Sequence, residues 1–150
     1  MKAIATTAEA EKALDDMTAL FAKLSALLEE ETALIKAGRV KRASELAATK
    51  STLAGELHAS GEQLRANAKF LLRAAPARCA VLQSRQEDFR TVLQRNMIVL
   101  ATTHAVSEGI VRRLSGDLAR KTSPQVYGAS GRASPPNPRH GRPLAISRTL

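Results

Sequence analysis

The stretch that decides the fold is residues 7–37, TAEAEKALDDMTALFAKLSALLEEETALIKA. Alternating steps of four and three residues along it select eight positions, of which seven are apolar. These positions are Ala10, Leu14, Met17, Phe21, Leu24, Leu28, Glu31 and Ile35. Such stepping follows one face of an α-helix, as it does in coiled coils. The spacing therefore predicts a long amphipathic helix over about residues 7–37, with Gly38 as the C-cap glycine that ends it.

The same stepping continues into two further segments. Over residues 40–73 it selects nine positions, six of them apolar, which predicts a second helix there. Ala75 precedes a proline and so resists the helical conformation, whereas Pro76 itself suits the first turn of a helix. A third helix is therefore predicted over about residues 76–121.

Residues 122–150 differ sharply in composition. They hold five of the six prolines, three of the eight glycines, four arginines and no acidic residue. A segment of this composition buries too little apolar surface to order itself, so we expect a flexible tail. Short connections make neighbouring helices antiparallel. The predicted fold is all-α, with an elongated antiparallel bundle of three long helices and coiled-coil packing in residues 1–121.

The positive charge of the chain is concentrated toward its C-terminal end. The 150 residues carry 23 basic and 14 acidic side chains, a formal net charge of +9. Residues 1–75 hold 11 basic and 10 acidic side chains and residues 76–150 hold 12 and 4, so the halves carry +1 and +8. This charge suits an acidic protein or a nucleic acid. Only four residues are aromatic, which is few for a platform that stacks bases.

Signals for targeting and catalysis are sparse. The first residues lack the apolar core of a signal peptide, and no apolar run approaches the roughly 20 residues of a membrane span. The single cysteine, Cys79, fits a reducing compartment, so we expect a soluble cytoplasmic protein. The three histidines lie in separate segments, and none has a carboxylate or cysteine at metal-ligand spacing. We therefore predict no enzyme, no metal site and no cofactor.

Three polar residues fall on the apolar series, namely Glu31, Lys50 and Asn96. If the chain turns near Gly38 and Pro76, Lys50 lies within about one helical turn of both other residues. We expect a buried polar layer that sets the register of the helices, a role that buried polar residues sometimes have. In the alternative, Lys50 extends into solvent and pairs with nothing.

Two sets of residues resemble FlgN-like flagellar export chaperones. Residues 28–57 resemble the helical hairpin of that family through the ordered pattern Leu28-x-x-Glu31-x-x-Leu34, Gly38 and Leu46-x-x-x-Lys50-x-x-Leu53-x-x-x-Leu57. Further along the chain, a second set resembles the end of the family's sequence pattern; it consists of Leu93-x-x-Asn96 and Tyr127-Gly128-Ala129-x-Gly131. The resemblance covers roughly residues 14–131 and implies a small helical cytoplasmic chaperone.

The resemblance also implies partners. Proteins of this family bind the hook–filament junction proteins FlgK and FlgL, prevent their premature assembly, and deliver them to a type III export gate that includes the cytoplasmic domain of FlhA. By resemblance, Tyr127, Gly128 and Gly131 dock the gate. The client, an amphipathic C-terminal segment, is expected on apolar residues late in the third helix: Leu100, Val106, Ile110, Val111, Leu114 and Leu118. The free protein could pair through the same face as a homodimer. A basic nucleic-acid or nucleoid-associated protein and a coiled-coil scaffold remain the alternatives.

Overall fold

The computed structural model describes residues 4–122, which form five α-helices and no strand. The helices are α1 (Thr7–Lys36), α2 (Val40–Glu45), α3 (Ala47–Ala66), α4 (Ala68–Ala74) and α5 (Pro76–Thr122). The all-α fold class is therefore confirmed. The boundary between two compact units falls between His104 and Ala105. The first unit contains α1 to α4 and the beginning of α5, and the described part of the second unit is residues 105–122.

Helix α1 begins with a capping box that the sequence analysis did not include. The hydroxyl of Thr6 accepts a hydrogen bond from the backbone N–H of Glu9 at 3.2 Å. The Glu9 carboxylate in turn accepts from the backbone N–H groups of Ala5 and Thr6 at 3.0 and 3.2 Å. The signal is the Thr-x-x-Glu spacing that precedes an apolar series. It satisfies backbone donors that an uncapped helix would leave without partners.

The end of α1 is a Schellman turn at Gly38. The backbone N–H of Gly38 donates to Ile35 O at 2.9 Å, and that of Arg39 donates to Leu34 O at 2.8 Å. Gly38 has a φ of +72°, a left-handed conformation that costs residues with a Cβ about 1–2 kcal/mol. Gly38 therefore ends α1 as its place in the sequence predicts, one residue after the C-cap Ala37.

The segment expected as one helix over about residues 40–73 is divided into α2, α3 and α4. At Leu46 the backbone stays near helical values, so that break is slight. At Asn67 the cause is its side chain, because Nδ2 donates to Gln63 O at 2.8 Å and Oδ1 accepts from the N–H of Ile4 at 3.2 Å. Asparagine side chains compete in this way with the helical ladder. Asn67 ties the start of the chain to the junction of α3 and α4.

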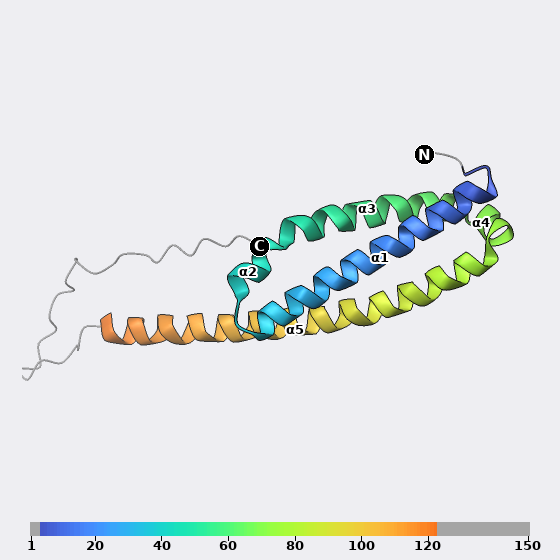
Figure 1. Ribbon diagram of the computed structural model, residues 1–150. Coiled ribbons are helices and arrows are strands. Elements are labelled where there is room, and N and C mark those ends of the chain that lie inside the picture. Colours follow the sequence, from blue (N-terminus) through green and yellow to red (C-terminus); the bar gives the residue numbers. More distant parts are fainter. Residues whose placement is uncertain (1–3, 123–150) are drawn as a thin grey trace, which may run out of the picture. The chain divides into compact units, whose positions relative to one another are not determined.

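Within the first unit, α1 lies between α3 and the beginning of α5 (Figure 1). All eight positions of its apolar series are buried. The corresponding residues of α2 to α4 are less covered, since only Ala43 and Leu71 are buried there. The rings of Phe21 and Phe89 pack against each other at a centroid distance of 5.1 Å, tilted by 45°, and join α1 to α5. Helix α1 thus supplies most of the core.

Candidate functional sites

The residues expected as a polar layer lie in contact, near the C-terminal end of α1. Lys50 Nζ of α3 lies 2.5 Å from Glu31 Oε1 of α1. Asn96 Nδ2 of α5 donates to Glu31 Oε2 at 2.9 Å. Glu31 and Asn96 are 5% and 2% exposed, so both polar groups are removed from water. The alternative in which Lys50 pairs with nothing is wrong.

The same cluster contains a fourth member, Thr32. Its hydroxyl accepts a hydrogen bond from Asn96 Nδ2 at 3.1 Å, and the carbonyl of Leu28 lies 3.2 Å from the same nitrogen. Thr32 was missed because it lies one residue beside the apolar series. The available signal was its spacing of four residues from Leu28, which places both on one helical face. We call Glu31, Thr32, Lys50 and Asn96 the polar cluster.

The polar cluster is closed by its own hydrogen bonds. In the part of the chain that the structure describes, no buried side-chain nitrogen or oxygen lacks a partner. The carboxylate of Glu31 receives a lysine on one oxygen and an amide on the other. Burying a carboxylate is expensive unless such partners are present. The cluster therefore favours the one register that brings α1, α3 and α5 together at this level.

A second candidate site is the apolar face of α5 in the second unit. Five large aliphatic residues are between 43% and 58% exposed there. They are Val106, Ile110, Val111, Leu114 and Leu118. At about 100° per residue they fall within an arc of about 140°. We call them the α5 stripe.

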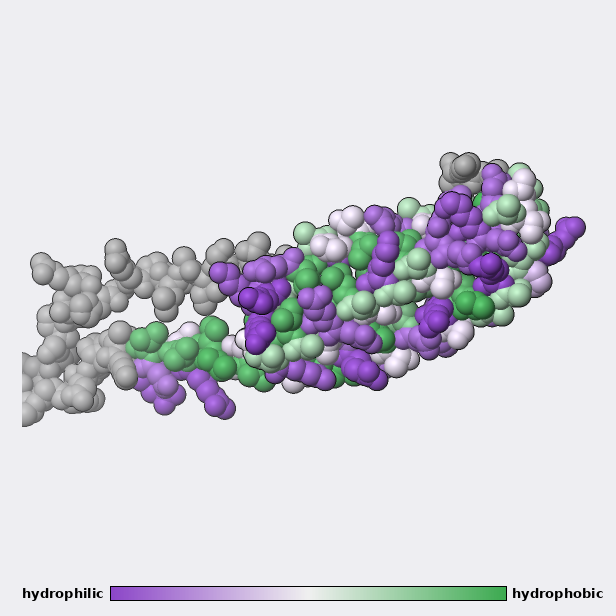
Figure 2. Space-filling view, viewed as in Figure 1, coloured by the Kyte–Doolittle hydropathy of each residue, from purple (hydrophilic) through white to green (hydrophobic). Residues whose placement is uncertain are grey.

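Polar residues share this part of α5: Ser107 and Asp117 fall within the arc at the same helical spacing, and three arginines fall outside it. Arg112, Arg113 and Arg120 lie outside the arc of the α5 stripe at the same helical spacing, and all three are exposed. Figure 2 shows hydrophobic and hydrophilic side chains on opposite sides of this end of α5. A helix with one apolar face normally buries that face against another element. The amphipathic pattern is the property that a helical partner would recognise.

The other residues expected in functional sites do not belong to the α5 stripe or to the polar cluster. Leu100 belongs to the first unit and is half-buried, so it exposes less surface than the α5 stripe. Tyr127, Gly128 and Gly131, expected to dock an export gate, lie outside the described residues, as does most of the expected tail over residues 122–150.

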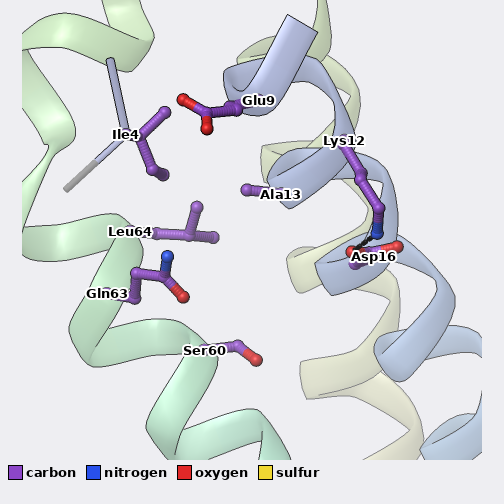
Figure 3. A pocket seen from close by; sticks show the side chains of 8 residues that line it. All are labelled: Ile4, Glu9, Lys12, Ala13, Asp16, Ser60, Gln63 and Leu64. Atoms are coloured by element: carbon purple, nitrogen blue, oxygen red, sulfur yellow. Dashed lines mark hydrogen bonds and ion pairs between the residues drawn. The ribbon is translucent and has the colours of Figure 1, made fainter. Parts of the chain in front are cut away.

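Two pockets indent the first unit. The smaller, of about 220 Å³, lies between the start of α1 and α3 (Figure 3). Its charged side chains are already engaged, because Lys12 pairs with Asp16 at 2.5 Å and Glu9 caps α1. The larger, of about 390 Å³, has the Phe21 and Phe89 rings among its lining residues. Charged residues line the larger pocket too, but its arginines are engaged, because Arg65 pairs with Glu62 and Arg90 pairs with Glu87.

Residues 4–122 contain no group of three or more histidine, cysteine, aspartate or glutamate side chains arranged to hold a metal ion. Over the same residues, no helix combines the length and the apolar character needed to span a bilayer. Comparisons with protein-family models, curated proteins and solved structures found no match for this chain.

Proposed function

We propose that this chain is a FlgN-like export chaperone that binds an amphipathic helical segment at the C-terminus of FlgK- or FlgL-like hook–filament junction proteins. In this proposal the chaperone covers its client's assembly surface in the cytoplasm until export. The proposed bundle is elongated and antiparallel, with three long helices and coiled-coil packing. The observation that carries the proposal is the α5 stripe, five aliphatic residues that remain about half exposed.

The chemistry of the α5 stripe supports a helical client. Aliphatic side chains at spacings of four residues offer the ridges into which the apolar face of another helix packs. Full burial of a Leu-sized side chain contributes roughly 1.5–3 kcal/mol. About half of that surface remains to be covered on each of the five residues. After the entropic costs of association, such a surface supports moderate affinity, which suits a chaperone that releases its client.

The polar cluster and the C-terminal segment take supporting roles in the proposal. The cluster holds the register of α1, α3 and α5, so that α5 is presented as a continuous helix from Pro76 onward. The segment around Tyr127 would dock an FlhA-like cytoplasmic domain of the export gate. Tyrosine is a frequent anchor at interfaces because it combines a large apolar ring with a hydrogen-bonding hydroxyl.

A direct binding measurement tests the proposal. The double variant Ile110→Gln/Leu114→Gln is compared with the unaltered chain for binding to a purified FlgK-like protein, by calorimetry. Each substitution removes an aliphatic side chain from the centre of the stripe. We expect at least about tenfold weaker binding, equivalent to about 1.4 kcal/mol.

The matched control removes equally exposed aliphatic surface elsewhere. Leu72→Gln/Val81→Gln replaces residues that are 62% and 51% exposed and lie outside the stripe. We expect the control to bind the FlgK-like protein as the unaltered chain does. Equal weakening in both double variants, or no binding by the unaltered chain, would contradict the proposal.

A further inference from the structure

The turn between α1 and α2 carries a dense cluster of unpaired positive charge. Its members are Lys36, Arg39, Lys41 and Arg42. All four side chains are exposed, and none lies within ion-pair distance of a described carboxylate. No acidic residue occurs over residues 32–44. We call these four residues the turn cations.

An aliphatic residue lies at the centre of the turn cations. Val40 is flanked in sequence by Arg39 and Lys41 and is 54% exposed. The Schellman turn at Gly38 fixes the backbone on which these side chains stand. Figure 2 shows hydrophilic surface gathered over α2 and this turn. The feature combines four cations with one exposed apolar side chain on a single short turn.

From this combination we propose that the turn binds the surface of an anionic phospholipid membrane. Each lysine or arginine near an anionic leaflet strengthens binding by about fivefold. An aliphatic side chain among the cations gains free energy at the boundary between headgroups and acyl chains. Val40 would gain no such contact on a phosphate backbone, and the turn offers no aromatic ring for stacking on bases.

The membrane contact is separate from the proposed client site. The turn cations belong to the first unit, and the α5 stripe belongs to the second. The two surfaces share no residue, so failure of either proposal leaves the other testable. The inference adds a peripheral membrane contact to a protein proposed to deliver clients.

Vesicle co-sedimentation of the full chain tests the inference. The probes are phosphatidylcholine vesicles with and without about one third phosphatidylglycerol, at about 0.1 M salt and again at about 1 M. The test variant replaces all four turn cations: Lys36→Gln, Arg39→Gln, Lys41→Gln and Arg42→Gln. We expect at least about tenfold weaker binding to the anionic vesicles at the lower salt, and a several-fold loss for the single variant Val40→Gln.

The control removes the same amount of charge from other exposed positions. It combines Lys23→Gln, Lys69→Gln, Arg73→Gln and Arg85→Gln, which lie away from the turn in the sequence. Both variants carry 9 − 4 = +5 by formal charge, so net charge does not distinguish them. We expect the control to stay within about threefold of the unaltered chain. Circular dichroism melting verifies that both variants fold.

Three results would overturn the inference. The first is equal weakening of both quadruple variants, which would assign the attraction to net charge alone. The second is absence of a preference for anionic vesicles at about 0.1 M salt, where exposed charges are incompletely screened. The third is binding of duplex DNA that depends on the turn cations, without binding of vesicles.

Discussion

Replacing Lys50 with methionine tests the polar cluster most directly. Methionine keeps the length and apolar stem of lysine but removes the cation that lies 2.5 Å from Glu31. The Glu31 carboxylate, 6% exposed as a side chain, then keeps only its hydrogen bond from Asn96. A carboxylate left buried without its counter-ion is the unfavourable state that this substitution creates.

The size of the effect follows from the burial of the two partners. Removing one member of a fully buried ion pair costs about 3–5 kcal/mol. Lys50 is 31% exposed as a side chain, so water replaces part of what its ammonium group supplies. A hydrogen bond to a charged group contributes about 1.5–3 kcal/mol. We therefore expect Lys50→Met to lower the free energy of unfolding by about 2–3 kcal/mol.

Urea denaturation followed by circular dichroism measures this change. The control is Lys23→Met, which removes an exposed lysine of α1 for which no ion pair is found among the described residues, with an expected change of less than about 0.5 kcal/mol. In the double variant Glu31→Leu/Lys50→Met, both members of the ion pair are removed. We expect its loss of unfolding free energy to be smaller, by at least about 1 kcal/mol, than the summed losses of the two single variants. If Lys50→Met behaves like its control, the reasoning about the polar cluster is refuted.

The other stability predictions concern backbone conformation and ring packing. Gly38→Ala should lower the free energy of unfolding by about 1–2 kcal/mol because of the left-handed φ, whereas Gly55→Ala, in open space within α3, should raise it by up to about 1 kcal/mol. Urea denaturation measures both, and changes of the same sign would contradict the conformational argument. Phe89→Ala should cost about 2–3 kcal/mol, because Phe89 is half-buried and its ring packs against that of Phe21 at 5.1 Å. A loss of under about 1 kcal/mol in thermal unfolding would show that the contact between the two rings stabilises the core little.

The helices could be predicted closely because their signals are local. The stepping of apolar residues, the glycine after α1 and the Ala75–Pro76 pair are all read within a few residues of one another. The break at Asn67 could not be predicted in this way. Its side chain accepts from the backbone of Ile4, which is 63 residues away in the sequence. Contacts of that kind depend on how whole segments meet.

The polar cluster shows which contacts can be predicted by counting residues from the turns and which cannot. Counting residues from Gly38 brings Lys50 to within about one helical turn of Glu31, because a tight turn leaves little freedom in the pairing of two helices. The same counting places Asn96 at that level but does not identify Thr32. The hydroxyl becomes part of the cluster only because Asn96 Nδ2 reaches it across the α1–α5 contact. The reach of the Asn96 side chain, more than the spacing of residues along α1, makes Thr32 a member of the polar cluster.

The α5 stripe illustrates a different limit of sequence patterns. The apolar series of α5 continues through both units, but Leu93 is half-buried whereas Leu114 is 57% exposed. A pattern of this kind predicts that a face is apolar and is silent about what covers it. A helical client that covers the stripe must also meet the exposed arginines beside it. Its specificity would then come from acidic residues flanking its own apolar face, because aliphatic contacts alone discriminate poorly between amphipathic helices.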